Sequence, residues 1–457
     1  MVKTVFKRKI YDEILEWKEK RSNKYALLIK GARRVGKSTI AEEFAKKEFK
    51  SYILIDFAHT SKAIIELFDD TYNLDFFFLQ LQQLTGIRLY ENESVIIFDE
   101  VQLLPKARQA IKYLVADGRY KYIETGSLLS IKKNTKDILI PSEEHKISMY
   151  PMDFEEFLYA NGVGEVAIDA MRESFNNNQA LSDTMHDKML DLFRKYLLVG
   201  GLPKAVEVFV ESRNVVEFRS IQKETHDLYG VDASKYEEEH DKKLKIRRIF
   251  DMIPSNLENK KKRVVIKDIE DKKWKRTNDY LDEFDYLISA GITLGVKAIS
   301  TPTYPLVENS GKNLLKLYLN DVGILSGIFY RNNIKAIMSE IKSINLGSIY
   351  ETVVAQELRA HGYDLYYYDN KKNGEVDFLI DDADNLSNIP IEVKSGKDYT
   401  VHSALDKFIA NDDYNIRKAY VLSNEREVFV DNGITYVPIY YIMFFQNISN
   451  VVEEFLD

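Results

Sequence analysis

Cysteine is absent from this chain of 457 residues, and histidine occurs only seven times. Without cysteine the chain has no disulfides, no cysteine-ligated zinc site and no thiol nucleophile. The histidines neither cluster nor recur at a spacing of four residues, whereas metal sites group their ligands at defined spacing. We therefore expect the histidines to be structural or surface residues.

Long apolar runs are also missing. No segment approaches the ~20 apolar residues that span a bilayer, and the N-terminal stretch "MVKTVFKRKIYDEILEWKEK" lacks the apolar region of a signal peptide. We therefore expect a cytoplasmic protein with no membrane partner. Hydrophobic residues make up 45% of the chain and charged residues 30%, which is ordinary for a soluble chain that buries real cores.

A glycine-rich loop follows an early apolar strand. The stretch "KYALLIKGARRVGKSTIAEEFAKK" places a strand before a G-x-x-x-x-G-K-[ST] match and an amphipathic helix after it, which is the context that this motif requires. Backbone N–H groups of such a loop cradle phosphates, Lys37 would neutralise the β and γ oxygens, and the Ser38 hydroxyl would ligate Mg²⁺. The expected nucleotide contacts are Gly31, Ala32, Arg33, Arg34, Val35, Gly36, Lys37, Ser38 and Thr39.

Two further strands supply acidic and hydroxyl groups. In "ESVIIFDEVQLLP" an apolar strand ends with Asp99, which would hold the magnesium through water, and Glu100, which would orient or deprotonate the attacking water. "YKYIETGS" contains Thr125 and Ser127, whose hydroxyls would bond the γ-phosphate or the water if this strand lies between the other two. Together with "SYILIDFAHT", these segments alternate with helices as a parallel sheet requires, and nucleotide binds at the carboxyl ends of such strands.

These stretches resemble the AAA+-related bacterial and archaeal ATPases in which an AAA domain is joined to a C-terminal domain of unknown function, DUF4143. The similarity covers nearly the whole chain and rests on "GARRVGKST", "IIFDEVQLLP", "ETGSLLS", "YPMDFEEFL", "YLLVGGLPKAV", "KLYLNDVGIL" and "EVDFLI...IEVKSG". It implies ATP as the nucleotide. It also implies that Pro203, in a Gly-x-Pro, packs on the adenine, and the alternative is a Gly/Pro turn between helices.

One departure from this family concerns the arginine finger. The family often has an arginine just before the "YPMDFEEFL" motif, where this chain has "IPSEEHKISMY". No finger is therefore assigned, and Arg33, Arg108 and Arg119 remain candidates. The departure argues mildly against a DNA-stimulated motor ring, and both a homo-oligomer and a partner protein stay open.

A basic segment lies in the middle of the chain. The net charge is -8, yet residues 241–276 carry 14 Lys or Arg against 6 Asp or Glu. Three expected helices and a hairpin from "ITLGVKAIS" to "LLKLYLND" predict a winged helix. DNA contact is one interpretation, since four basic residues lead into the third helix and suit a grip on phosphates; the alternative is a solvated basic face used for packing or nucleotide sensing. The four are Lys272, Lys273, Lys275 and Arg276.

The C-terminal part has a second set of chemically active groups. In "GEVDFLI" and "IPIEVKSG" two apolar segments place Asp377, Glu392 and Lys394, and residues two apart in a strand face the same way. Two carboxylates and a lysine suit Mg²⁺-assisted phosphodiester hydrolysis, with the lysine stabilising charge or orienting a water. The spacing resembles the PD-(D/E)xK nuclease core, and Glu351 in the preceding helix matches an acidic residue that many members contribute. The alternative is a salt-bridged, exposed face of a hairpin.

We therefore predict an α/β chain. Residues 1–150 would form a P-loop, parallel-sheet AAA+ ATPase core, 151–206 a helical lid, 207–310 a winged helix and 311–457 a PD-(D/E)xK restriction-endonuclease-like domain. The predicted function is that of a Mg²⁺-dependent ATPase whose nucleotide cycle controls the C-terminal modules on DNA. The alternative is a STAND-like nucleotide switch with a non-cutting scaffold that binds a partner, because fold does not settle function.

Overall fold

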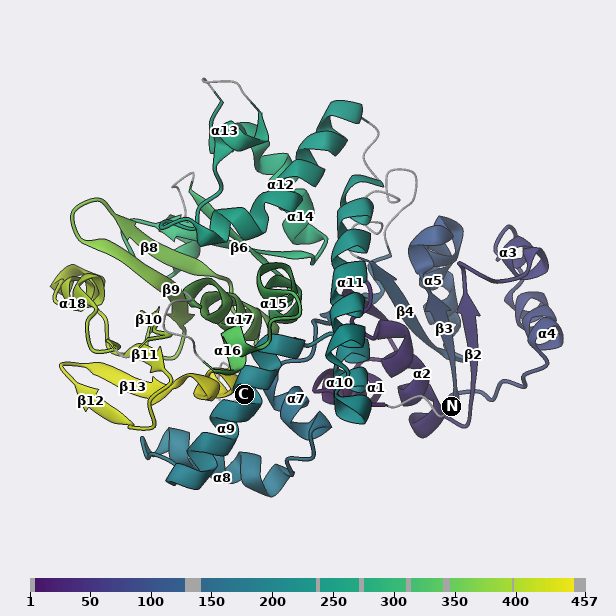
Figure 1. Cartoon of the computed structure of the whole chain (residues 1–457). Coiled ribbons are helices and arrows are strands. Elements are labelled where there is room, and N and C mark those ends of the chain that lie inside the picture. The colour runs from purple at the N-terminus through teal and green to yellow at the C-terminus, as the bar shows by residue number, and fades with distance from the viewer. Residues whose placement is uncertain are drawn as a thin grey trace. The chain divides into compact units, whose positions relative to one another are not determined.

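The computed structural model describes residues 5–127, 141–235, 239–270, 275–309, 314–339, 346–396 and 398–447. The chain forms two compact units (Figure 1). The first unit comprises Met1–Pro151 with Ser289–Gly291, and the second comprises Met152–Ile288 with Ile292–Asp457. None of the helices in the described part of the chain has both the length and the apolar character needed to cross a membrane.

The first unit is built on a five-stranded, fully parallel sheet in the order β2-β3-β4-β1-β5. This confirms the predicted parallel sheet. The strand β4, which carries Thr125 and Ser127, lies between β1 and β3. This is the position that the sequence analysis required for these two hydroxyl groups to reach the γ-phosphate or the attacking water. The strands are β1 (Ala26–Gly31), β2 (Ser51–Asp56), β3 (Ser94–Asp99), β4 (Lys121–Ser127) and β5 (Glu144–Ser148).

Helices cover this sheet and bury its apolar side chains. On one face, Ile96 and Phe98 of β3 share a hydrophobic cluster with Leu81 of α4 and Leu114 of α5, and burial of side chains of this size is the main stabilising contribution to such a layer. The helices of the unit are α1 (Ile10–Lys20), α2 (Lys37–Glu48), α3 (Lys62–Leu67), α4 (Leu74–Thr85) and α5 (Pro105–Asp117), with a 3-10 turn η1 (Val101–Leu103).

The second unit begins with a helical region. Its helices up to β6 are α7 (Phe154–Ala160), α8 (Glu165–Asn176), α9 (Asp183–Val199), α10 (Pro203–Ser212), α11 (Val215–Lys235), α12 (His240–Glu258), α13 (Ile266–Ile269) and α14 (Leu281–Ser289), with η2 (Thr277–Tyr280). Later helices are α15 (Val322–Tyr330), α16 (Lys335–Met338), α17 (Gly347–Ala360) and α18 (Ser403–Ile409), with 3-10 turns η3 (Leu306–Asn309), η4 (Asp412–Tyr414) and η5 (Ile439–Phe444).

An eight-stranded mixed sheet forms the core of the second unit, in the order β12-β13-β11-β10-β9-β8-β6-β7. The strand β9 runs antiparallel to both of its neighbours, β8 and β10, and β11 joins β10 in parallel. These strands are β6 (Thr293–Ile299), β7 (Leu315–Leu319), β8 (Tyr366–Asn370), β9 (Gly374–Asp382), β10 (Ser387–Val393), β11 (Ala419–Ser423), β12 (Phe429–Asp431) and β13 (Ile434–Pro438).

The hairpin predicted as a wing is the antiparallel pair of β6 and β7. It lies at the edge of the eight-stranded sheet, because β6 also pairs with β8 in parallel. The predicted boundary between residues 310 and 311 therefore falls between two strands of one sheet. Since the hairpin and the predicted nuclease-like strands share this sheet, a winged helix at this place remains a prediction.

Candidate functional site

The phosphate loop joins the end of β1 to the start of α2. Its backbone takes left-handed conformations at Arg34 (φ 65°) and Gly36 (φ 101°), and glycine adopts such angles without steric cost. At Gly31, a Cβ atom would lie 2.2 Å from the carbonyl oxygen of Met149. The glycines at both ends of the motif are thus required by the fold of the loop itself.

The Lys37 ammonium lies inside this loop. It is 5% exposed, and its Nζ donates to the carbonyl oxygens of Gly31 at 3.2 Å and Ala32 at 2.8 Å. Burial lowers the pKa of Lys37 to about 8, while the charges of Glu100 and Asp99 act in the opposite direction. The ammonium is therefore held where phosphate oxygens would approach the loop. Because its pKa is lowered to about 8, it loses its proton more readily than an ordinary lysine.

The ends of β3 and β4 bring oxygen atoms to the first turn of α2. The Ser38 hydroxyl donates to Asp99 Oδ1 at 2.7 Å, and the Thr125 hydroxyl donates to the same oxygen. The Glu100 backbone N–H donates to Thr125 Oγ1 at 3.3 Å, and Glu100 itself has a left-handed backbone with φ 54°. Three carboxyl or hydroxyl groups from separate segments thus meet beside Lys37, as the sequence predicts, and hard oxygen donors of this kind suit Mg²⁺.

The remaining predicted nucleotide contacts divide between the units. Ser127 ends β4 and stands opposite Gly31 in the sheet register, while Thr39 lies in the first turn of α2. Pro203 starts α10 in the second unit, so its contact with adenine stays a prediction. The turn before it has a structural reason of its own, because a Cβ atom at Gly201 would lie 2.0 Å from the carbonyl oxygen of Met152.

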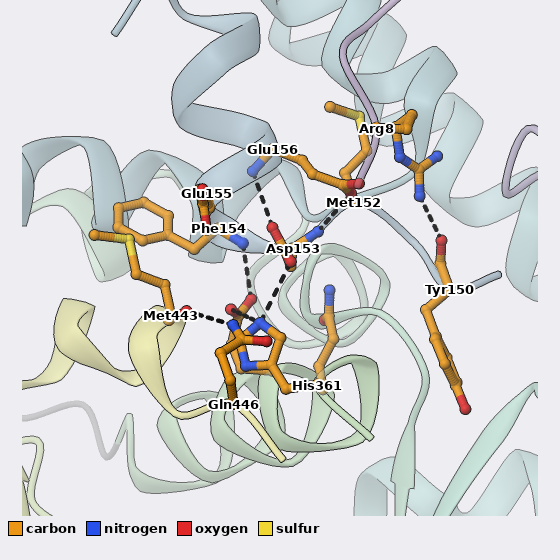
Figure 2. A network of polar contacts seen from close by, with 12 residues as sticks. Arg8, Tyr150, Met152, Asp153, Phe154, Glu155, Glu156, His361, Met443 and Gln446 are labelled. Atoms are coloured by element: carbon orange, nitrogen blue, oxygen red, sulfur yellow. Dashed lines mark hydrogen bonds and ion pairs between the residues drawn. The ribbon is translucent and has the colours of Figure 1, made fainter. Parts of the chain in front are cut away.

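Sequence reasoning missed Arg8, which holds the phosphate loop from the N-terminal segment. Its side chain is buried and donates to the carbonyl oxygen of Val35 at 2.9 Å and to that of Tyr150 at 2.8 Å. Figure 2 shows the second of these bonds. The residue stands in a basic stretch, "FKRK", and nothing in that pattern separates it from the lysines on either side.

Two of the arginines left open as finger candidates form internal ion pairs. Arg108 makes a two-point contact with Glu144, with distances of 2.7 and 2.8 Å, and both side chains are buried. Arg119 pairs with Asp117 and Asp75. Bidentate arginine–carboxylate pairs fix geometry, so both arginines are held by carboxylates of the first unit.

The predicted C-terminal residues meet in one acidic centre of the second unit. Asp377 Oδ2 accepts from the Val393 backbone N–H at 2.9 Å, and Lys394 Nζ lies 2.8 Å from Glu392 Oε1. Burial, together with the charges of Glu392 and Glu351, raises the pKa of Asp377 well above its ordinary value. The structure therefore brings Glu351, Asp377, Glu392 and Lys394 together.

Three basic side chains that the sequence did not predict complete this centre. Lys262 contacts Glu351, Lys316 Nζ lies 2.6 Å from Glu375 Oε1, and Arg263 Nη2 lies 2.9 Å from Glu375 Oε2. Burial alone would raise the pKa of Glu351, but the ammonium groups of Lys316 and Lys262 outweigh it and leave this pKa lowered. These cations come from a turn and a strand far away in the sequence, so no local pattern marks them.

The basic middle segment is partly neutralised within the chain. Of the four residues predicted to grip DNA, Lys272 and Lys273 lie outside the described residues. Lys275 is 3.9 Å from Asp279, and the Arg276 backbone N–H bonds to the same aspartate at 2.7 Å. The carboxylate of Asp279 therefore reduces the positive potential that Lys275 offers to phosphates.

The "YPMDFEEFL" motif starts α7 and joins it to α17 (Figure 2). Asp153 caps α7 in a capping box with Glu156, and the Phe154 backbone N–H donates to Glu357 Oε1 at 2.9 Å. His361 Nε2 lies 3.3 Å from Asp153 Oδ2. Asp153, Glu357 and His361 offer ligand atoms within 4.8 Å of one another, but each already has a protein partner, so we assign them a structural role.

Three family models match three separate stretches of the chain. Residues 23–158 match the family model "AAA domain", residues 190–334 match a domain of unknown function (DUF8612), and residues 346–442 match a domain of unknown function (DUF4143). An uncharacterized protein of Methanocaldococcus jannaschii is 24% identical over 468 residues, which cover 94% of this chain and 88% of that protein.

Among solved structures, a Walker-type ATPase of Pyrococcus abyssi matches with 16% identity and a TM-score of 0.40, covering 70% of this chain and 95% of its own. The RuvB Holliday junction branch migration motor of Thermotoga maritima matches with 13% identity and a TM-score of 0.29, covering 63% and 89%. These TM-scores are low, so the fold assignment depends on the sheet order and the loop. The match to the family model, the parallel sheet and the glycine-rich loop agree with one another, and residues 23–158 are therefore similar to P-loop domains of the AAA type.

Proposed function

We propose that this protein is a Mg²⁺-dependent ATPase whose nucleotide cycle controls a winged-helix and nuclease-like module that acts on DNA. The observation that carries the ATPase is the convergence of Lys37, Ser38, Asp99 and Thr125 at the carboxyl edge of the parallel sheet. Phosphoryl transfer is catalysed mainly by positioning and charge neutralisation, and these residues supply both.

The roles in the nucleotide site follow from the contacts. Ser38 and Asp99 would hold Mg²⁺, which supplies charge neutralisation on the phosphate oxygens when bound. Lys37 now bonds to carbonyl oxygens of its own loop, and the phosphates of ATP would replace these acceptors. Glu100 follows the Mg²⁺-side aspartate by one residue, in a left-handed backbone conformation, and it would orient or deprotonate the attacking water.

The order of elements in the second unit supports a nuclease-like module. A helix with an acid (α17) precedes three antiparallel strands (β8 to β10), and a helix (α18) then leads to a strand parallel to β10. This order agrees with the sequence expectation of a helix with an acid, two apolar strands and a return to helix and strand, and it supports the proposal that Asp377, Glu392 and Lys394 are the active groups of a PD-(D/E)xK-like module. Asp377 and Glu392 would hold Mg²⁺ for phosphodiester hydrolysis, with Lys394 stabilising charge.

A second candidate is the STAND-like switch, in which the C-terminal module binds a partner without cutting. One observation favours it: basic side chains already compensate the acidic centre, as Lys262, Lys316 and Lys394 each contact a carboxylate there. A buried ion-pair network of this kind can persist as a scaffold, because removal of one partner is costly.

The test is cleavage of labelled single-stranded, duplex and branched DNA with Mg²⁺ or Mn²⁺, with and without ATP. Wild type is compared with Asp377→Ala and Lys37→Ala. We expect cleavage that is lost in Asp377→Ala, and a loss in Lys37→Ala as well would couple cutting to the ATP site. Absence of cleavage under every condition, with ATP turnover intact, would reject the nuclease module in favour of the switch.

A further inference from the structure

Lys262 enters the acidic centre from outside the sheet. It lies in the turn that follows α12, where its backbone is left-handed with φ 49°. Its side chain is 18% exposed and contacts Glu351, whose side chain is 5% exposed. A lysine rarely adopts this backbone region, and such strain persists where surrounding contacts hold it in place and where it serves a function.

Glu351 is thereby fully engaged by protein groups. One of its oxygens contacts Lys262, and the other accepts from the Tyr318 hydroxyl at 2.8 Å. The Lys316 ammonium, which lies 2.6 Å from Glu375, adds a further positive charge to the surroundings of Glu351. A carboxylate whose negative charge is already balanced by an ammonium group at contact distance attracts a second metal ion less strongly.

The other two acids remain open to a cation. Asp377 uses Oδ2 for the Val393 backbone N–H, and Glu392 uses Oε1 for Lys394. Glu392 Oε2 is buried and has no hydrogen-bond partner among the described residues. Buried polar atoms are nearly always paired, so this oxygen is an acceptor that the fold leaves available for a cation.

We propose that Lys262 is a resident cation of the acidic centre, which occupies Glu351 and so limits the centre to one divalent metal ion, bound by Asp377 and Glu392. This inference rests on the proposed metal-dependent function of the second unit. Lys262 would then determine how many metal ions the acidic centre holds when a phosphodiester is bound. It also removes Glu351 from the metal ligands that the sequence predicts.

The experiment is a titration of the nucleotide-free full-length protein with Mn²⁺, followed by calorimetry and by the electron paramagnetic resonance signal of free Mn²⁺. Each protein is also measured with Asp377→Asn added. The Mn²⁺ binding that this substitution removes is the binding that depends on the acidic centre. We expect one such ion in wild type. In Lys262→Met we expect a second ion, or affinity at least about tenfold higher, because a unit positive charge has left a low-dielectric site.

Matched variants separate charge from packing. Lys261→Met removes an exposed lysine from the same turn and should bind Mn²⁺ as wild type does, as should Lys262→Arg, which keeps the charge. The gain in Lys262→Met should disappear when Glu351→Gln is added. Thermal unfolding shows whether each variant is folded, and Glu351→Gln alone keeps the test open if Lys262→Met does not fold.

Three results would overturn the inference. The first is Asp377-dependent binding that is equal in wild type and Lys262→Met. The second is the loss of that binding in Glu351→Gln alone, since Glu351 would then be a ligand. The third is the absence of Asp377-dependent Mn²⁺ binding in both wild type and Lys262→Met, which would reject the proposed metal site itself and is thus distinct from the first two.

Discussion

The two sites of this chain are built in different ways. The nucleotide site depends on backbone: a loop with two left-handed residues, a glycine against Met149, and hydroxyl and carboxyl groups at neighbouring strand ends. The acidic centre depends on charge, since carboxylates from α17, β9 and β10 are compensated by Lys262, Lys316 and Lys394. A site of the first kind offers donors to an anion, whereas in a site of the second kind the protein's own cations already balance part of the negative charge.

The largest expected effect concerns Glu100 in the nucleotide site. In Glu100→Gln the attacking water loses its base, so ATP turnover should fall by about 10²–10⁴-fold. ATP binding should remain, because Lys37, Ser38 and Asp99 are unchanged. Steady-state hydrolysis and binding of a fluorescent ATP analogue check both statements. Equal losses of binding and turnover would show that Glu100 acts on the ground state instead.

The charge balance of the acidic centre predicts the next effect. Lys316 is 1% exposed and paired with Glu375, and its charge also acts on the buried carboxylates of Glu351 and Asp377. Lys316→Met removes this charge from the centre and should destabilise the second unit by about 3–5 kcal/mol. Calorimetric unfolding measures this as a lower transition temperature. Lys50→Met, which breaks an exposed pair with Glu93, is the control and should change stability by less than about 1 kcal/mol. Similar shifts in the two variants would contradict a charge-built centre.

The pH dependence of ATP binding tests the buried ammonium of Lys37. Since its pKa is lowered to about 8, the free protein loses this charge above that pH, while bound phosphates favour the charged form. Binding must then take up a proton, and affinity should fall about tenfold between pH 7 and pH 9. Calorimetry in buffers of different ionisation enthalpy detects the proton. Affinity independent of pH in this window would show that Lys37 stays charged.

The smallest expected effect is at the start of α7. Asp153→Ala removes the N-cap of this helix and the contact with His361, which should cost about 1–2 kcal/mol of stability. Ser182→Ala removes the cap of α9, where the side chain accepts from Met185, and serves as a control without the histidine. Thermal unfolding of both variants measures the difference. A larger loss for Ser182→Ala would argue against the contact between Asp153 and His361.

The nucleotide site could be predicted from sequence because its parts are local. Lys37 and Ser38 follow their strand within one motif, and Asp99 and Thr125 end apolar strands whose parallel pairing places them at one edge. Arg8 could not be predicted, because the acceptors that tie it to the phosphate loop and to Tyr150 are backbone carbonyl oxygens. Every residue has a backbone carbonyl group, so such an acceptor cannot be recognised from the residue type.

The acidic centre was predictable only in part. The period of a strand places Glu392 and Lys394 on one side, and their spacing from Asp377 indicates the pair of strands. The cations Lys262 and Lys316 come from a turn after α12 and from β7, and the register that brings them to the centre is set by tertiary packing. The edge position of the β6–β7 hairpin in the eight-stranded sheet was missed for the same reason.

The most direct test of the central claim is ATP turnover by the purified chain in the presence and absence of Mg²⁺. Wild type is compared with Lys37→Ala and with Lys46→Ala, which changes a half-exposed lysine on the same helix. We predict Mg²⁺-dependent hydrolysis that Lys46→Ala retains and Lys37→Ala loses. Hydrolysis that persists in Lys37→Ala, or a wild type that neither binds nor hydrolyses ATP, would contradict the account.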